Sequence, residues 1–184
     1  MTKIVQEPNK ILRGIAKEVT ISDIPSGAIQ KTLVDMKTAL HREPDGVAIA
    51  APQIAVPLRI FIIAGFVFDL KKKKSDDTKS PDKVFINPEI TKVSKTTKWI
   101  EGEGCLSVRW IYGTAERHQK ASIRATDETG KKFTIHASGL LAQIFQHEVD
   151  HLNGILFTDH AKNIRHMTDE EIADYKEELK RLSH

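Results

Sequence analysis

Residues 140–154, LLAQIFQHEVDHLNG, constrain the fold of this chain more than any other stretch of its sequence. Apolar residues fall on nearly every face of the helix that their spacing predicts, which is typical of a buried helix. The same helix carries four ionisable side chains within five positions, namely His147, Glu148, Asp150 and His151. A buried ionisable group without a partner costs on the order of several kcal/mol, so these groups need partners.

The spacing of the two histidines predicts a metal site. His147 and His151 are four residues apart, so on a helix they lie on one face, one turn apart. With Glu148 they form the pattern H-E-x-x-H, in which two imidazoles hold one divalent metal ion. The glutamate stays outside the coordination sphere, where it can accept a proton from metal-activated water. A metal ion gives both histidines a partner at once, so we interpret this helix as metal-binding.

A catalytic metal with two histidine ligands needs a third protein ligand. The extended protease pattern requires a histidine where this chain has Phe157, so that pattern fails. A glutamate about twenty residues downstream is a second source, and Glu170 and Glu171 lie at that distance. The third source is Cys105, the only cysteine, in the stretch WIEGEGCLSV. A thiolate ligand explains the cysteine and the helix together; the alternatives are a small buried cysteine and a nucleophile activated by His147.

The rest of the chain predicts strands before this helix and another helix after it. A helix is expected within residues 26–42, with Ser26 as its N-cap. Ser138 is expected to cap the H-E-x-x-H helix, and Asn153 and Gly154 to end it. Strands are expected at residues 58–70 and 84–90, and as a hairpin at residues 121–137. In the last helix, residues 168–184, Thr168 and Glu171 form a capping box.

These elements predict one α+β domain over residues 1–184. We expect antiparallel β-sheets packed around the central H-E-x-x-H helix, with a C-terminal surface helix at residues 168–184. Residues 68–83 are expected to form a basic hairpin loop, which includes the four lysines at positions 71–74. Residues 71–83 hold six lysines and three aspartates, so the net charge of this segment is +3, the same as that of the whole chain. The loop is interpreted as solvated, with a contact to RNA or another anionic partner as the alternative; no DNA partner is expected.

The sequence also predicts a cytoplasmic location. One cysteine permits no intrachain disulfide, which suits a reducing compartment. The start of the chain reaches Pro8 without a long apolar run, and no stretch of about 18 apolar residues follows. We therefore expect neither a signal peptide nor a membrane span.

Three motifs resemble the signatures of the peptide deformylase family. They are GVAIAAPQ at residues 46–53, EGCLS at residues 103–107 and QHEVDHLNG at residues 146–154. Their order also matches the family, and the resemblance runs from about residue 4 to residue 160. One position departs from it, because Ala48 stands where the family usually has the second glycine of G-x-G-hydrophobic-A-A-x-Q. The added methyl group narrows the cleft, or is absorbed if φ is negative there.

The resemblance implies a hydrolase that removes the formyl group from the N-terminal formyl-methionine of new polypeptides and releases formate. Metal-activated hydroxide would attack the formyl carbon, with Glu148 as general base and then as general acid. The Gln53 amide and the Leu106 backbone N–H would stabilise the oxyanion together with the metal. The metal implied is Fe²⁺, with Zn²⁺, Ni²⁺ or Co²⁺ able to substitute. Its ligands would be Cys105, His147 and His151.

By the same resemblance, a peptide cleft binds N-formylmethionyl nascent chains. Its expected lining residues are Gly46, Val47, Ala48, Ile49, Gly104 and Ile144. Of these, Val47, Ile49 and Ile144 are equally typical of core residues. Glu103 and Arg117 are expected to pair across the sheet and to steady the cysteine loop, with a surface charge as the alternative for Arg117.

Two other classes of protein stay open from the sequence. One is a zinc protease that uses Glu170 or Glu171 as the third ligand. The other is a non-catalytic, metal-held module that binds ribosomes or nascent chains. A transient ribosome contact through the closing helix is a further hypothesis.

Overall fold

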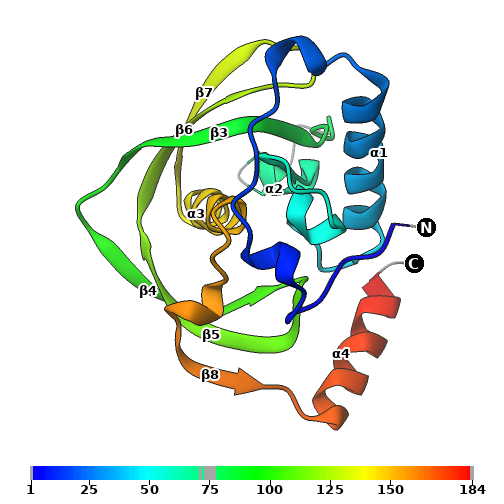
Figure 1. Cartoon of the computed structure of the whole chain (residues 1–184). Coiled ribbons are helices and arrows are strands. Elements are labelled where there is room, and N and C mark those ends of the chain that lie inside the picture. Colours follow the sequence, from blue (N-terminus) through cyan, green and yellow to red (C-terminus); the bar gives the residue numbers. More distant parts are fainter. Residues whose placement is uncertain (1, 71, 73–77, 183–184) are drawn as a thin grey trace.

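Helix α3, Leu140–Leu152, lies between two antiparallel sheets and carries the H-E-x-x-H motif. The structure is a computed structural model that describes residues 2–70, 72 and 78–182. Figure 1 shows α3 near the centre, with β6 and β7 on one side of it and β4 and β5 on another. The expected α+β fold, with antiparallel sheets around this helix, is confirmed.

The larger sheet has five strands in the order β1-β2-β3-β6-β7, and all its neighbouring strands are antiparallel. They span Ala48–Ala50 (β1), Ile60–Ile63 (β2), Lys83–Val93 (β3), Lys120–Thr126 (β6) and Lys132–Ser138 (β7). The smaller sheet has the order β4-β5-β8, with bounds Thr97–Cys105, Val108–His118 and Lys162–His166. The helices are α1 (Gly27–His41), α2 (Gly65–Asp69), α3 and α4 (Asp169–Leu182). Short 3-10 turns span Lys10–Arg13, Ile21–Asp23, Ala51–Ile54 and Phe157–Asp159.

The core lies between α3 and the five-stranded sheet, with α1 packed at its other end. The rings of Phe61 and Phe85 stack at 4.4 Å, and Phe145 of α3 meets Phe85 at 5.6 Å. All three rings are fully buried, and each contributes roughly 1.5–3 kcal/mol by leaving water. On the other side of α3, Gln146 accepts a hydrogen bond from the His118 backbone N–H at 2.9 Å and donates one to the His118 carbonyl at 3.0 Å. The helix is thereby fixed against the smaller sheet as well.

Several local predictions are confirmed. The Ser26 side chain accepts a hydrogen bond from the Ile29 backbone N–H at the start of α1. At the start of α4, Thr168 and Glu171 accept hydrogen bonds from each other's backbone N–H groups, which is the expected capping box. Strands β6 and β7 form the expected hairpin, and Asp127 accepts three hydrogen bonds within its turn.

The strand predicted at residues 58–70 is too long. The strand ends at Ile63, and helix α2 begins at Gly65. A Cβ atom at Gly65 would lie 1.9 Å from the Ser80 carbonyl oxygen, so the chain turns where only glycine fits. The predicted loop at 68–83 therefore begins inside α2, although it does connect the paired strands β2 and β3. Residues 71 and 73–77 of that loop lie outside the described residues.

The predicted N-cap of α3 is also wrong, whereas its predicted end is confirmed. Ser138 is the last residue of β7, where it pairs with Lys120, and the cap is Gly139 with a φ of 63°. The step from strand to helix requires this positive φ, which glycine adopts without strain. At the other end Asn153 is the C-cap and Gly154 has a φ of 75°. None of the helices in the described ranges combines the length and the apolar character that crossing a bilayer requires.

Candidate active site

Three donor side chains from two elements meet at one point beside α3. Cys105 ends strand β4, and His147 and His151 lie one turn apart on α3. One ligand atom from each of them lies within 4.8 Å of the others, and the Cys105 Sγ lies 3.1 Å from the His151 Nε2. The structure thus brings together the cysteine and the two histidines predicted as ligands.

The sulfur of Cys105 is surrounded by hydrogen-bond donors. The Ser107 backbone N–H donates to it at 3.4 Å, and the Gln53 side-chain amide approaches it at 3.6 Å. Burial opposes ionisation, but the charges and hydrogen bonds of His151 and His147 outweigh it and lower the pKa of the thiol to about 5. The thiolate is the form that binds a metal ion, so this sulfur is prepared as a ligand at neutral pH.

Glu103 fixes the orientation of His147. Its Oε1 atom lies 2.9 Å from the His147 Nδ1, and since a carboxylate only accepts, this nitrogen carries the proton. The His147 Nε2 is then left with its lone pair for a metal ion, an arrangement common in metal sites. Burial raises the pKa of Glu103, but His147 and Arg117 outweigh burial and hold it well below its usual range.

The expected pair of Glu103 and Arg117 is confirmed. Arg117 donates from Nε and Nη2 to the two carboxylate oxygens, at 3.1 and 2.5 Å, and both side chains are almost fully buried. Its Nη1 atom donates to Asp150 of α3 at 2.6 Å, which gives that aspartate a partner outside the metal cluster. One arginine therefore links β5 to the cysteine strand and to the histidine helix.

Two buried polar atoms have no hydrogen-bond partner among the described residues, and both lie in the H-E-x-x-H motif. They are the Glu148 Oε2 and the His151 Nδ1. Burial raises the pKa of Glu148 above its ordinary value. Burial lowers the pKa of His147, but the Cys105 thiolate and Glu103 outweigh burial and raise it well above 6.5, so the cluster favours positive charge. A thiolate and two imidazoles are a donor set that divalent ions accept, and they leave a position open.

A cavity of about 240 Å³ adjoins this cluster. Most of the residues predicted for the site line it, namely Val47, Ala48, Gln53, Gly104, Cys105, Leu106, Ile144, His147 and Glu148. Three predicted residues are absent from its lining. Ile49 is fully buried in the core, His151 is buried with an exposed fraction of 1%, and a Cβ atom at Gly46 would lie 2.9 Å from Leu40. The side chain of Ile49 therefore lies in the core, and the predicted role of Ile49 in substrate binding stays a prediction, while the lack of a side chain at Gly46 allows close packing against Leu40.

The side chain of Gln53 is held in one orientation. Its Oε1 accepts a hydrogen bond from the Ala50 backbone N–H at 2.8 Å, so its NH₂ group points the other way. That group donates to the Ser107 Oγ at 3.2 Å and approaches the cysteine sulfur. Gln53 is buried, with an exposed fraction of 2%, and its N–H groups face the Cys105 sulfur and Ser107.

Ala48 is accommodated without strain. It lies in β1 with extended backbone, and its methyl group is almost fully buried. Because an L-residue adopts extended backbone freely, the departure from the family glycine is absorbed by the fold.

Several lining residues were not identified from the sequence as part of a site. They are Asp45, Gly102, Val108, Arg109, Trp110, Tyr112, Leu140, Gln143 and Tyr175. They come from β4, β5, the loop after α1, α3 and helix α4, and no motif spacing connects them. Only the packing of the elements places these side chains at the cleft.

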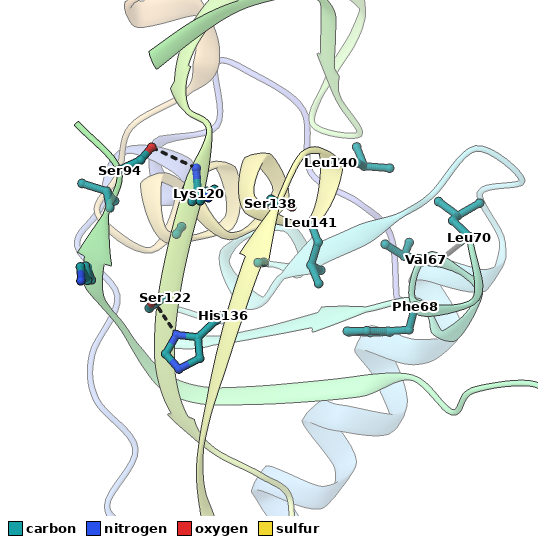
Figure 2. A pocket seen from close by; sticks show the side chains of 14 residues that line it. Val67, Phe68, Leu70, Ser94, Lys120, Ser122, His136, Ser138, Leu140 and Leu141 are labelled. Carbon is teal, nitrogen blue, oxygen red and sulfur yellow. Dashed lines mark hydrogen bonds between the residues drawn. The ribbon is translucent and has the colours of Figure 1, made fainter. Parts of the chain in front are cut away.

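The other candidate sites do not assemble. Glu171 caps α4 and pairs with Arg165, and neither it nor Glu170 belongs to a group of metal donors in the described residues. A larger cavity of about 640 Å³, shown in Figure 2, lies against β6, β7 and α2. Its lining is largely apolar and contains one side chain able to bind a metal ion, His136, which is hydrogen-bonded to Ser122. The cleft beside Cys105 is therefore the candidate active site.

The fold and this cleft define a metal-dependent hydrolase of the H-E-x-x-H type, and comparisons with known proteins name its family. A family model described as polypeptide deformylase matches residues 1–167. A peptide deformylase of Symbiobacterium thermophilum is 40% identical over 174 residues, which cover 91% of this chain and 70% of that protein. A peptide deformylase of Mesorhizobium japonicum is 39% identical over 158 residues, which cover 86% of this chain and 82% of that protein. The chain belongs to the polypeptide deformylase family.

Solved structures agree with this assignment. A class I type b peptide deformylase of Acinetobacter baumannii with Met-Ala-Ser bound aligns with a TM-score of 0.73 and 31% identity, covering 85% of this chain and 96% of that one. A peptide deformylase of Legionella pneumophila aligns with a TM-score of 0.72 and 35% identity, covering 100% of this chain and 95% of that one. The protein is thus a hydrolase that removes the formyl group from N-terminal formyl-methionine.

Proposed function

We propose that the cleft beside Cys105 is where this chain deformylates new polypeptides, with one divalent metal ion held by Cys105, His147 and His151. The observation that carries the proposal is the convergence of these three ligand atoms within 4.8 Å, next to a buried Glu148 oxygen that has no partner among the described residues. We propose Fe²⁺ as the natural ion, with Zn²⁺, Ni²⁺ or Co²⁺ as substitutes, because the mixed thiolate and imidazole set suits all four. When bound, such an ion supplies Lewis acidity, which lowers the pKa of water and polarises a carbonyl group.

Glu148 moves the proton in this mechanism. Its carboxylate takes a proton from the attacking water and later delivers it to the amine that leaves as the new N-terminus. Burial raises the pKa of this carboxyl above its ordinary value, so it takes up a proton more readily than an exposed glutamate does. Because Glu148 is not one of the proposed metal ligands, its carboxylate can accept and donate this proton.

Gln53 and Leu106 stabilise the negative charge that develops on the formyl oxygen. The Gln53 NH₂ group is already oriented by the backbone of Ala50, so no reorganisation is needed during the reaction. The Leu106 carbonyl accepts a hydrogen bond from the Gln6 side chain at 2.9 Å, which fixes the peptide group between Leu106 and Ser107, next to the one that carries the Leu106 N–H. Loss of one such donor typically raises the barrier by about 3 kcal/mol.

The nascent peptide binds along β1. This strand is at one edge of the five-stranded sheet, and Val47 and Ala48 face the cleft. An extended peptide can add to such an edge through main-chain hydrogen bonds. Ile144 of α3 offers an apolar wall for the methionine side chain. We also propose a cytoplasmic location and a transient contact with the ribosome, where such peptides emerge.

Formate release from formyl-Met-Ala-Ser tests the mechanism, with the protein prepared without oxygen and its metal content counted. We expect about one metal ion per chain, and in Glu148→Ala the same metal content with formate release lowered at least about a hundredfold. Glu178→Ala, an exposed glutamate on α4, is the matched control and keeps both properties. Unaltered release in Glu148→Ala would remove Glu148 from the mechanism. Metal without release in the native chain would contradict the proposed substrate.

A further inference from the structure

Helix α4 contributes to the cleft although it lies beyond the region matched by the family model. The match ends at residue 167, and α4 begins at Asp169. Yet Tyr175 of this helix lines the cavity together with Trp110 and Tyr112 of β5. Figure 1 shows α4 following β8 at the edge of the molecule. The outer end of the cleft therefore has a wall that the family match does not include.

Tyr175 is held in place by contacts to two other elements. Its hydroxyl donates to the Asp45 Oδ2 at 3.3 Å, and its ring meets the edge of Trp110 with 6.0 Å between centroids. Burial, followed by the nearby Asp45, raises the pKa of Tyr175 to about 12, so the hydroxyl stays a donor. The helix is thus fixed at the mouth of the cleft through this side chain.

The charges at this end of the cleft compensate one another. Arg109 donates to both oxygens of Asp45, at 2.6 and 3.0 Å, and to Glu43 at 2.5 Å. Two carboxylates therefore share one guanidinium, and the cation of Lys176 lies further out, 5.4 Å from the centroid of the Trp110 ring. A peptide carboxylate entering beside Asp45 would lose water and meet two carboxylates that already engage Arg109, which disfavours it there.

The remaining surface at this end is aromatic. Tyr112 packs its ring against Gly104, where a Cβ atom would lie 2.7 Å from the ring, so the ring lies directly on the cysteine strand. Tyr175 and Trp110 continue the aromatic surface outward. Aromatic walls favour apolar or aromatic partners, because packing removes the apolar surface of both from water.

We propose that Tyr175, Trp110 and Tyr112 form an outer subsite that contacts the peptide residues after formyl-methionine and favours aromatic or long apolar side chains there over acidic ones. The inference rests on the proposed function, because it places the formyl group at the metal cluster and the rest of the peptide toward α4. Asp45 and Arg109 act as positioning residues that hold Tyr175 at the wall.

Steady-state kinetics on four substrates test the subsite: formyl-Met amide, formyl-Met-Ala-Ala, formyl-Met-Phe-Phe and formyl-Met-Asp-Asp. We expect kcat/KM to be about tenfold higher for the Phe peptide than for the Asp peptide, mainly through KM. Tyr175→Ala removes most of this preference, whereas Tyr175→Phe keeps the ring and most of the preference. Glu178→Ala, on the same helix and exposed, behaves as the native chain.

The outcomes separate the subsite from simple support of the fold. If Tyr175→Ala lowers kcat/KM by one common factor for all four substrates, Tyr175 supports the fold and the subsite is overturned. A native chain without preference between the Phe and Asp peptides overturns it as well, and this result does not depend on any variant folding. No formate from any substrate would instead overturn the proposed function, and the subsite with it.

Discussion

A single buried carboxylate, that of Glu103, orients one of the proposed metal ligands, His147. It accepts hydrogen bonds from His147, from Arg117 and from Gln143 at 3.0 Å, so its charge is buried but fully partnered. A buried carboxylate stays charged only when hydrogen bonds and opposite charges surround it, because burying the charge alone costs on the order of several kcal/mol. Glu103 thus fixes the ring orientation of His147, which leaves the Nε2 atom to the proposed metal ion.

Replacement of the third ligand tests the cluster at the residue scale. In Cys105→Ala we expect the metal content to fall from about one ion per chain to near zero, because two imidazoles alone hold an ion weakly. Elemental analysis after dialysis measures this. Glu171→Ala is the comparison, because Glu171 is the alternative ligand that the sequence left open. Metal loss in Glu171→Ala with retention in Cys105→Ala would refute the ligand set.

At the scale of single elements, glycines with left-handed backbone direct the strands and helices toward the site. Gly102 has a φ of 74° at an irregularity in the pairing of β4 with β5. Such a bulge changes which face of the strand the next side chain takes, and here Glu103 turns inward and is buried. Gly154 ends α3 in the same conformation, against the backbone of Arg13.

The end of α3 offers a test with a matched control. At Gly154 a Cβ atom would lie 2.5 Å from the Arg13 carbonyl oxygen, so Gly154→Ala adds both backbone strain and a clash with backbone. Gly130 has a similar φ of 87° but open space around it. We expect Gly130→Ala to lower the free energy of unfolding by about 1 kcal/mol and Gly154→Ala by about 3 kcal/mol. Urea unfolding of the metal-loaded proteins measures both, and equal losses would contradict the close packing at Gly154.

At the scale of the whole molecule, ion pairs connect segments that are distant in the sequence. Arg109 of β5 joins the loop after α1 to the smaller sheet, and Tyr175 adds α4 to the same group. Asp45 is partly buried there; burial raises its pKa, but Arg109 outweighs burial, and the net effect is a pKa below the ordinary value.

This group predicts how stability depends on pH. Because the pKa of Asp45 is lower in the folded than in the unfolded chain, its pairing stabilises the fold above the unfolded pKa of about 4. That contribution is lost as the pH falls through the folded pKa. We expect Asp45→Asn to be less stable than the native chain at pH 7, with the difference shrinking as the pH falls from about 5 to 3. Urea unfolding across this range measures it, and a constant difference would show that Asp45 stabilises the fold independently of its charge.

The sequence by itself determined the features that depend on neighbours within a few residues. The four-residue spacing of His147 and His151 places both rings on one face of a helix, and the caps at Ser26 and Thr168 use side chains beside the helix ends. The alternation of apolar and polar residues along each strand, and the turn after Asp127, likewise specify the β6–β7 hairpin. These are short-range constraints, and local geometry suffices to satisfy them.

Only the tertiary structure decided which distant groups meet. The sequence left two sources for the third metal donor, Cys105 and the glutamates at positions 170 and 171, and the structure places Cys105, at the end of β4, beside the two histidines of α3. The tertiary structure also places Glu103 beside His147 and Tyr175 at the cleft. The N-cap of α3 is Gly139 rather than the predicted Ser138. The physical reason is that both sheets pack around one helix, so contacts between segments far apart in the sequence follow from burial of shared apolar surface rather than from any local pattern.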